Sequence, residues 1–319
     1  MTNKHNKVLI IGPGNMGYEY YKCLKNLNYE VHVIGRTVNS FKRFKAHNDI
    51  FRYESIEEFL SINDVKDFKL SIISVSVEAL MHSSIQAIKA GFKRILIEKP
   101  AGLYKSEIAK LITLADKKKT QIFIAYNRRY YGSVQEALNI IKNDGGALSC
   151  HFDFTEWEKS VLTSGVDDKV LKRWFFANST HIIDTVFFLI GTPKKISFYG
   201  RKLLDWHSGN SIMAGSGISS NKVLFSFHSN WNSAGRWSMD ISTTHHKIIF
   251  CPIEELKIMK KNSIVVHDLP KDEDDTNFKP GLLKQLKDLM KKKPVFACSL
   301  SEHAKNWEIY EDMFNRRKL

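Results

Sequence analysis

Three glycines near the start of the chain are the residues best suited to hold an anionic ligand. The motif Gly12-Pro13-Gly14-Asn15-Met16-Gly17 follows the apolar, β-branched run of residues 7–11, and a helix-like stretch comes next. Gly12 permits a tight turn, Gly14 lets the backbone approach a pyrophosphate, and Gly17 lets the helix lie close to its strand. The free N–H groups at the start of the helix face such an anion. The motif predicts a dinucleotide site; the alternative is a βα turn that needs glycine only for shape.

Arg36 indicates which dinucleotide is preferred. It follows the second predicted strand, residues 30–34, at the place about 20 residues past the glycines where an NAD site has Asp or Glu on the adenosine ribose. A guanidinium cannot accept that hydrogen bond, and it suits a 2′-phosphate. Arg36, with Thr37 behind it, therefore favours NADP(H) as the cofactor. If Arg36 only stacks on the adenine, the preference is mixed and NAD(H) remains an alternative.

Hydride transfer between an alcohol carbon and a nicotinamide needs a group that handles the hydroxyl proton, and a nearby cation stabilises the developing alkoxide. Lys99, at the end of the predicted strand 94–98, is the candidate cation; its alternative role is an ion pair with Glu98 or another structural carboxylate. His181 is the candidate acid or base, since imidazole titrates near neutral pH. It lies in an apolar helix-like stretch, residues 180–190, so a core histidine is an equal alternative.

The elements that must position these residues alternate between strands and helices up to residue 126. This rhythm predicts an α/β fold with a doubly wound parallel sheet and right-handed crossovers. In such sheets ligands bind beyond the carboxyl ends of the strands. We therefore expect the side chains that follow the predicted strands to meet at one edge: Gly12, Arg36, Ser74 to Ser76, Glu98, Lys99, Tyr126 and Asn127.

From residue 127 the pattern changes to one dominated by strands. A second, α+β domain with a large open, mostly antiparallel sheet is expected, so the predicted domains are residues 1–126 for the cofactor and 127–319 for the substrate. The acidic stretch 271–275 is expected to be a loop. Strands are predicted at residues 148–154, 195–199, 223–231, 237–242, 247–250 and 263–267, and helices at 134–142, 180–190, 281–290 and 301–316.

Composition limits the class of protein. With 43% hydrophobic and 26% charged residues and no long apolar run, the chain has the composition of a globular protein without a membrane span. The N-terminus has no signal-peptide core, which predicts a cytoplasmic location. The four cysteines show no spacing typical of a disulfide framework or a metal site. The net charge of +14 favours anionic ligands, and no nucleic-acid-binding motif accompanies it.

Four signals in order resemble the Gfo/Idh/MocA family of oxidoreductases: the glycine motif, Glu98-Lys99-Pro100, Asn127-Arg128-Arg129-Tyr130, and His181-Ile-Ile-Asp184 on a helix that ends in Gly191. The resemblance implies a Rossmann domain, then an open-sheet domain that mediates homodimers or homotetramers. It also implies a nicotinamide cofactor held by residues from Gly12 to Gly17, Arg36, Thr37, Ser74, Ser76, Glu98, Lys99 and Asn127. Catalytic roles for Lys99 and His181, a cis peptide before Pro100 and a sugar-like substrate are implied as well.

One departure from the family concerns the proton relay. Many relatives have Asp four residues before the histidine, where this chain has Ala177. Asn178 is a candidate for positioning the substrate by hydrogen bonds, and Asp184 for orienting His181 or capping a loop. The remaining candidates for substrate contact are Arg129, Lys172, Trp174 and Asp184 itself, with Arg173 beside Lys172 and Trp174. A loop flanked by Asn230-Trp231 and Gly235-Arg236-Trp237 suits either sheet packing or a sugar face.

The leading functional hypothesis is an NADP(H)-dependent oxidoreductase that acts on a hydroxyl or keto group of a carbohydrate. A sugar nucleotide or an acidic sugar of surface-polysaccharide synthesis is the expected substrate class. Two alternatives keep the fold: a glycosidase that retains NAD for transient oxidation, and a non-catalytic NADP-sensing regulator. Arg36 weighs against the glycosidase and the intact Lys99 and His181 against the sensor, whereas Ala177 keeps the sensor open.

Overall fold

The computed structural model describes residues 6–315, and the chain divides into two compact units. Within the described residues, unit 1 runs to Asn127 and also includes Asn277–Lys305, whereas unit 2 comprises Arg128–Thr276 and the chain from Asn306 onward. The first crossing between the units lies one residue from the boundary expected at 126/127. The segment 277–305, which we expected in the second domain, belongs to unit 1. The N-terminal segment 1–5 and the predicted end of the last helix, Arg316, lie outside the described residues.

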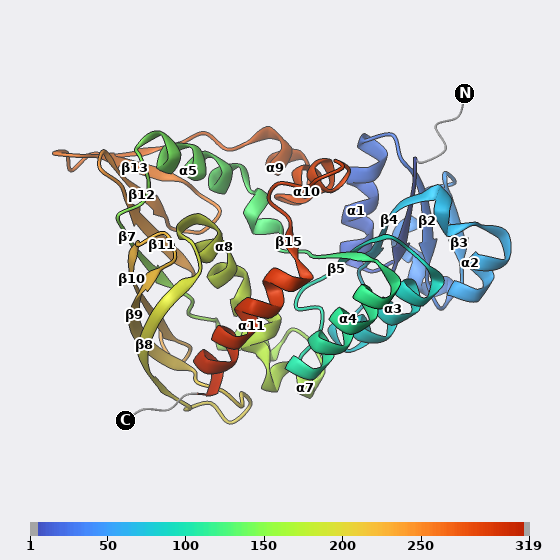
Figure 1. Cartoon of the computed structure of the whole chain (residues 1–319), viewed down its shortest axis with the longest axis horizontal. Coiled ribbons are helices and arrows are strands. Elements are labelled where there is room, and N and C mark those ends of the chain that lie inside the picture. Colours follow the sequence, from blue (N-terminus) through green and yellow to red (C-terminus); the bar gives the residue numbers. More distant parts are fainter. Residues whose placement is uncertain (1–5, 316–319) are drawn as a thin grey trace. The chain divides into compact units, whose positions relative to one another are not determined.

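Unit 1 contains a seven-stranded sheet in the order β15-β6-β5-β4-β1-β2-β3. Strands β2, β3, β4, β5 and β15 of this sheet are labelled in Figure 1. All of its strands are parallel except β15, which pairs antiparallel with β6. The predicted doubly wound Rossmann sheet is thereby confirmed. The strands are β1 (Lys7–Ile11), β2 (Glu30–Ile34), β3 (Ile50–Tyr53), β4 (Phe68–Ile73), β5 (Arg94–Ile97), β6 (Gln121–Ile124) and β15 (Cys298–Ser299).

Local signals set the helices of unit 1. The Ser55 hydroxyl accepts a hydrogen bond from the Glu58 N–H and begins α2, and Gly91, at a φ of 102°, ends α3. Helices α3 and α4 pack together (Figure 1). The helices are α1 (Asn15–Asn26), η1 (Val38–Phe44), α2 (Ile56–Ile62), η2 (Val65–Asp67), α3 (Val77–Ala90), α4 (Lys105–Lys118) and η3 (Asn127–Tyr130), the last of which extends into unit 2.

Helix α10 (Leu282–Leu289) explains why the chain returns to unit 1 after residue 276. Its four leucines, Leu282, Leu283, Leu286 and Leu289, are buried in one hydrophobic core with Tyr20, Cys23 and Leu24 of α1 and with strands β1, β2 and β4. Leucines at this spacing form one apolar helix face, which needs a partner surface. The helix therefore completes the cover over α1.

Unit 2 contains an eight-stranded sheet in the order β14-β13-β12-β11-β7-β10-β9-β8. Its strands pair antiparallel except β7 with β10, which confirms the mostly antiparallel second domain. Two strands, β9 and β13, were not predicted. The strands are β7 (Ser149–Asp153), β8 (Pro193–Arg201), β9 (Ile212–Ser219), β10 (Leu224–Asn230), β11 (Ser238–Ser242), β12 (His246–Phe250), β13 (Lys257–Lys260) and β14 (Val266–Asp268).

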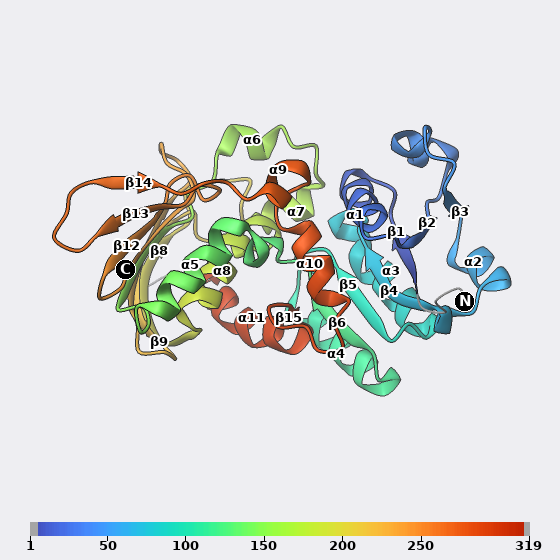
Figure 2. The ribbon, with the colours of Figure 1, turned by 90° about the horizontal axis from the view of Figure 1, so that it is seen from above.

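Helices α5 (Gly132–Asn143) and α8 (Thr180–Ile190) lie on the same face of this sheet (Figure 2). A π-helical turn, η4 (Phe175–Ser179), leads directly into α8. The resemblance assigns oligomer contacts to the open sheet, and that assignment stays a prediction. The remaining helices are α6 (Glu158–Leu162), α7 (Asp168–Lys172), α9 (Glu273–Asn277) and α11 (Leu300–Asn315), of which α9 and α11 cross the unit boundary.

The expectation that residues 271–275 form a loop holds for Lys271 and Asp272 and was wrong for the three residues that follow. Glu273–Asn277 is a short helix, because Asp272 accepts hydrogen bonds from the Asp275 N–H and from Thr276. The Asp275 carboxylate in turn accepts from the Gly132 N–H at the start of α5. Within residues 6–315 no disulfide joins the cysteines, and no helix is long and apolar enough to span a membrane.

His207 predicts a pH-dependent stability of unit 2. Its ring is fully buried against Trp231 and Phe314, and burial lowers the pKa of the imidazole to about 4. The unfolded chain titrates near 6.5, so between about pH 6.5 and 4 it binds a proton that the folded chain does not. Because of this residue, we expect the free energy of unfolding, measured in urea, to be about 2 kcal/mol lower at about pH 5 than at about pH 7. His207→Gln should flatten that dependence, and the exposed His267→Gln should not; equal pH profiles for all three proteins would contradict it.

Candidate active site

The glycine motif in unit 1 forms a close turn with an open edge. Gly12 has a φ of 108°, and a Cβ there would lie 2.7 Å from the Ser74 backbone. A Cβ on Gly17 would meet the Gly12 carbonyl oxygen, whereas a Cβ on Gly14 would meet no atom within 4 Å. Gly12 and Gly17 are therefore required by packing. Gly14 instead leaves space beside the backbone, as the approach of a pyrophosphate requires.

The start of α1 is suited to an anion. Gly14 is the N-cap and supplies no side-chain hydrogen bond to the first turn, which also contains no acidic residue. Its backbone N–H groups and the helix dipole are thus available to a phosphate. Of the two residues between the glycines, Asn15 is exposed and Met16 packs partly against the core. The residues present therefore fit the pyrophosphate of a dinucleotide.

Arg36 and Thr37 lie beside this turn. The Gly12 N–H donates to the Ile34 carbonyl at the end of β2, 3.0 Å away, so the glycine turn and the residues after β2 are neighbours. Gly35 follows, and a Cβ there would lie 2.5 Å from Pro13. Arg36 is exposed, and Thr37 caps η1 by accepting a hydrogen bond from the Ser40 N–H. The guanidinium is therefore accessible where a ribose 2′-substituent would be recognised.

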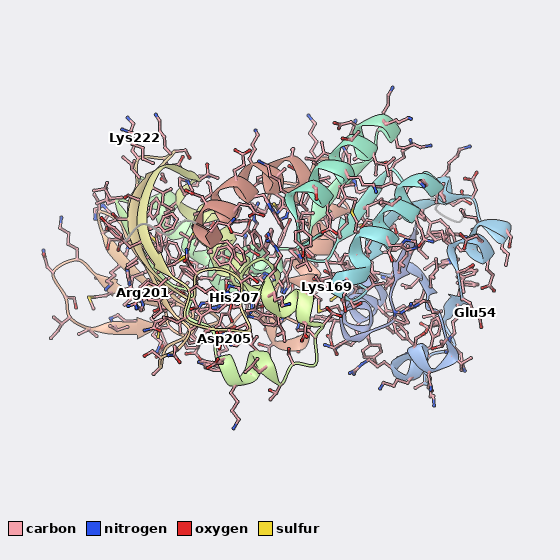
Figure 3. The ribbon with its side chains drawn as sticks, turned by 90° about the horizontal axis from the view of Figure 1, so that it is seen from below. Glu54, Lys169, Arg201, Asp205, His207 and Lys222 are labelled. Atoms are coloured by element: carbon pink, nitrogen blue, oxygen red, sulfur yellow. The ribbon has the colours of Figure 1, made fainter. Side chains whose placement is uncertain are left out.

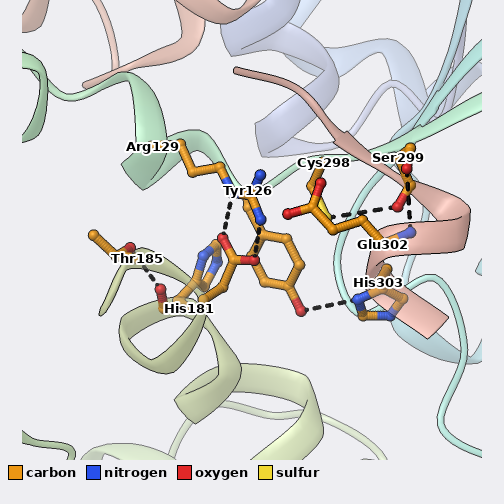
Figure 4. Close-up of polar contacts among 9 residues, drawn as sticks. Tyr126, Arg129, His181, Thr185, Cys298, Ser299, Glu302 and His303 are labelled. Carbon is orange, nitrogen blue, oxygen red and sulfur yellow. Dashed lines mark hydrogen bonds and ion pairs between the residues drawn. The ribbon is translucent and has the colours of Figure 1, made fainter. Parts of the chain in front are cut away.

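Lys99 follows β5 and is anchored by its neighbours. Glu98 is buried and accepts a hydrogen bond of 2.7 Å from the Tyr20 hydroxyl. Burial raises the pKa of its carboxyl, although that hydrogen bond and the charge of Lys99 act to lower it. The Lys99–Pro100 peptide is cis, as the resemblance implied. The Pro100 carbonyl accepts from His303 Nε2 at 3.1 Å. Because Nε2 carries the proton, Nδ1 accepts from the Tyr126 hydroxyl (Figure 4).

Backbone hydrogen bonds place the predicted cofactor residues of unit 1 on one edge of the sheet. The N–H groups of Gly12, Ser74, Glu98 and Ala125 each donate to the last residue of a neighbouring strand: Ile34, Ile11, Ile73 and Ile97. Ser76 is exposed at the start of α3. Two side chains are used internally, since Ser74 Oγ donates to the Gly12 carbonyl and Asn127 Nδ2 to the Pro280 carbonyl. Ser74 and Asn127 therefore shape the edge through these hydrogen bonds.

His181 lies in unit 2 at the first turn of α8 and is 5% exposed. Its ring centroid is 6.5 Å from that of Trp237, and its carbonyl accepts a hydrogen bond from Thr185 (Figure 4). Ala177, at the place of the family's aspartate, is buried in the π-helical turn η4. Because Lys99 and His181 belong to different units, their joint action stays a prediction.

Arg129 and Asp184 form a buried ion pair in unit 2. Arg129 Nε and Nη2 donate to the two carboxylate oxygens of Asp184 at 2.8 and 2.6 Å, and the side chains are 3% and 0% exposed (Figure 4). The pair links η3 to α8. Such a bidentate, desolvated pair leaves little capacity for a substrate. The predicted substrate contacts by Arg129 and Asp184 are therefore not supported, and both residues stabilise the fold.

Glu156 is a candidate site residue that the sequence did not reveal. It follows β7, is 1% exposed, and accepts hydrogen bonds from Asn178 Nδ2 at 3.0 and 3.1 Å and from Ser179 Oγ at 2.7 Å. Burial raises the pKa of its carboxyl, against these hydrogen bonds and the charge of Arg236. The only signal in the sequence was a carboxylate just past a predicted strand, and nothing local linked it to residues 178 and 179.

The other predicted substrate residues differ in exposure. Lys172 is exposed at the end of α7, and Trp174 is half-buried and lies near Glu156. Arg173 is paired with Glu311 at 2.7 Å and contacts the Phe176 ring. Asn178 is half-buried and held by Glu156. Lys172 and Trp174 thus remain available for a substrate, and the Asn178 amide has a fixed orientation.

Residues 6–126 match the family model of the Gfo/Idh/MocA oxidoreductases, described as an oxidoreductase family with an NAD-binding Rossmann fold. The match covers the first domain, which is a Rossmann domain of the Gfo/Idh/MocA type. The chain is an NAD(P)-binding oxidoreductase of this type. No match was found among curated protein sequences.

Solved structures share the fold of both units. Levoglucosan dehydrogenase in complex with NADH aligns at a TM-score of 0.77 and 15% identity, over 97% of this chain and 96% of the other. An oxidoreductase from Agrobacterium radiobacter, in complex with NAD+, L-tartaric acid and magnesium, aligns at a TM-score of 0.76 and 13% identity, over 96% of this chain and 94% of the other. The WlbA dehydrogenase from Chromobacterium violaceum, in complex with NADH and UDP-GlcNAcA, aligns at a TM-score of 0.71 and 16% identity, over 98% of this chain and 94% of the other.

Removing one charge of the buried pair Arg129–Asp184 should destabilise the protein. Asp184→Asn leaves the Arg129 guanidinium buried opposite a neutral amide, and we expect a loss of about 3–5 kcal/mol in the free energy of unfolding. The exposed Asp205→Asn (Figure 3) is the matched control and should change stability by less than about 0.5 kcal/mol.

Urea unfolding of both variants and of the double variant Arg129→Met/Asp184→Leu measures the effect. The double variant should recover part of the loss, because no buried charge is left without a partner. A loss in Asp184→Asn as small as that in Asp205→Asn would contradict the interpretation.

Proposed function

We propose that this enzyme is an NADP(H)-dependent oxidoreductase that moves a hydride between the nicotinamide and a hydroxyl or keto group of a carbohydrate. The single observation that carries the cofactor preference is Arg36, exposed directly after β2 and beside the glycine turn. A planar guanidinium binds a phosphate with paired charge-assisted hydrogen bonds, whereas it cannot accept one from a ribose hydroxyl. The net charge of +14 supports an anionic cofactor in the same sense.

The chain's own residues have two roles in this proposal. When bound, the nicotinamide accepts or supplies the hydride. The Lys99 ammonium orients the substrate oxygen and stabilises the charge that develops on it as the hydroxyl proton leaves. His181 takes up or returns that proton, since imidazole changes protonation near neutral pH. The burial of His181 and its contact with Trp237 exclude water from one side of the imidazole.

The substrate class is a carbohydrate that carries an acidic group or is linked to a nucleotide. Two structural neighbours support it by the ligands and activities in their names: levoglucosan dehydrogenase, and a dehydrogenase with bound UDP-GlcNAcA. The positive charge of this chain favours an anionic sugar over a neutral one. The sensor alternative makes a different prediction, namely tight NADPH binding without turnover of any keto-sugar.

The first test exchanges the charge at Arg36. Arg36→Asp should weaken NADPH binding about 10- to 100-fold, because it removes hydrogen bonds to a charged group worth about 1.5–3 kcal/mol. Binding of NADH should stay the same or improve. Fluorescence titration of both coenzymes measures this, with the exposed Arg201→Asp of unit 2 as the control for net charge (Figure 3). Equal affinity of the wild type for both coenzymes would refute the preference.

The second test removes the cation at position 99. Lys99→Met should lower the rate of hydride transfer to a keto-sugar about 10²- to 10³-fold, as expected when a donor to a developing oxyanion is lost. NADPH affinity should fall by much less, because the glycine motif and Arg36 still bind the phosphates. Single-turnover nicotinamide absorbance gives the rate, and the exposed Lys222→Met is the control (Figure 3). Wild-type rates in Lys99→Met would remove this residue from the mechanism.

A further inference from the structure

Two arginines and two tryptophans of unit 2 form a cluster that the proposed chemistry does not use. The Arg236 guanidinium lies 4.7 Å from the centre of the Trp157 ring and 4.6 Å from that of Trp237. The Arg128 guanidinium lies 4.7 Å from the centre of the same Trp237 ring. We call Arg128, Trp157, Arg236 and Trp237 the Arg–Trp cluster.

The sheet brings three members of the cluster together, and Arg128 is contributed by η3. Strands β7 and β11 are antiparallel neighbours, with Asp153 opposite Ser238, so the chain leaving β7 meets the chain entering β11. Trp157 lies past the first of these ends and Arg236 and Trp237 just before the second. The Trp157 indole N–H donates to the Gly235 carbonyl at 2.7 Å and joins the two segments. The Arg–Trp cluster is therefore held by backbone as well as by ring contacts.

The cluster has more positive charge than its surroundings neutralise. Glu156 is the carboxylate within ion-pair distance of Arg236, at 3.5 Å, and it already accepts three hydrogen bonds from Asn178 and Ser179. Arg128 has no ion-pair partner within the described residues. The two guanidinium groups that flank Trp237 thus have one carboxylate near them, on the Arg236 side, and its hydrogen-bonding capacity is largely used.

The cluster is also accessible. The Arg236 side chain is 38% exposed and Trp157 is 53% exposed, although Trp237 is buried. A guanidinium in contact with aromatic rings keeps its N–H edge available for hydrogen bonds, which matches the geometry of a carboxylate or a phosphate. An exposed indole is in addition a surface on which the apolar face of a sugar ring can pack.

The position of the cluster ties it to the proposed reaction. Trp237 contacts the His181 ring, and Glu156 is bound by Asn178 and Ser179, which come directly before the helix that carries His181. We infer that Arg236, in contact with Trp157 and Trp237 and assisted by Arg128, binds an oxyanion of the substrate, either the carboxylate of an acidic sugar or a phosphate of a sugar nucleotide. This inference rests on the proposed function, because it assigns the subsite to the same substrate.

The first experiment measures binding without turnover. Tryptophan fluorescence of the whole enzyme is titrated with UDP-glucuronate, UDP, glucuronate, inorganic phosphate and glucose. We expect saturable quenching by UDP-glucuronate and by one of its two charged parts, and none by glucose. If UDP binds and glucuronate does not, the subsite is assigned to the diphosphate. If glucuronate binds and UDP does not, it is assigned to the carboxylate.

Variants locate this binding. Arg236→Met keeps much of the side-chain volume but removes the charge, and it should weaken UDP-glucuronate about 10- to 100-fold. Arg128→Met should weaken UDP-glucuronate binding less than Arg236→Met does. Arg236→Lys should retain only part of the wild-type affinity, because an ammonium lacks the planar, forked geometry of a guanidinium. Trp157→Phe should remove part of the quenching. The exposed Arg201→Met, which changes the net charge equally, should bind as the wild type does.

Two results would overturn the inference: wild-type affinity in both Arg236→Met and Arg128→Met, or equal binding of glucose and UDP-glucuronate. If urea unfolding shows that Arg236→Met is not folded, the affinities of Arg236→Lys and Arg128→Met for UDP-glucuronate decide whether the inference holds. The titration measures binding without catalysis, so the two proposals can fail separately. If quenching depends on Arg236 but the protein reduces no sugar, the proposed function is refuted and the anion subsite is retained. With an active substrate, Arg236→Met should raise KM for acidic sugars and leave kcat nearly unchanged.

Discussion

The candidate cofactor edge depends on four backbone hydrogen bonds that continue the parallel ladder beyond the strands. The N–H groups of Gly12, Ser74, Glu98 and Ala125 donate to the carbonyls that end the neighbouring strands. A strand's last carbonyl would otherwise need water or a side chain as partner. Because each loop leaves the sheet only after this bond, the residues that follow start from fixed positions. The glycine turn, Arg36 and Lys99 are therefore placed by backbone geometry and not by their own side chains.

Buried carboxylates in both units are paired in ways that match their roles. Asp184 receives a bidentate guanidinium, which compensates its desolvation and leaves a rigid link between η3 and α8. Glu98 and Glu156 receive mainly neutral donors, the Tyr20 hydroxyl in one case and Asn178 with Ser179 in the other. Neutral donors leave more of the desolvation cost in place, and burial raises the pKa of both carboxyls. Glu98 directly precedes Lys99 in the chain, and Glu156 binds two residues that come just before His181.

Much of the fold could be predicted because its signals are local. The strand Glu30–Ile34 and the helix Thr180–Ile190 have the predicted bounds, since an apolar run and a glycine stop define each of them. Strand β9 was missed because Gly215 and Gly217 interrupt its pattern; a Cβ at either place would meet Phe198, Phe225 or Phe227. The pair Arg129–Asp184 and the return of α10 to unit 1 join residues far apart in the chain. No spacing rule predicts such contacts.

The same distinction applies to the site. Gly12, Gly17, Arg36 and Lys99 could be chosen from the sequence, because each follows a strand within one βα unit. Glu156 could not, since its partners lie more than 20 residues away in η4. The sequence suggested that Ala177 leaves the substrate side of His181 without a carboxylate, yet a carboxylate reaches the neighbouring residues from the end of β7.

The origin of that carboxylate limits what it can do. A carboxylate carried on the helix next to His181 could approach a substrate or the imidazole directly. Glu156 instead has its two oxygens bound by Asn178 and Ser179, and it lies 3.5 Å from Arg236. Leaving these donors to take part in a proton transfer would cost the hydrogen bonds that make its burial tolerable. Glu156 is therefore better suited to orient the Asn178 amide and the Arg236 guanidinium than to move a proton. In the proposed reaction, proton transfer then falls to His181, and recognition falls to the groups that Glu156 holds.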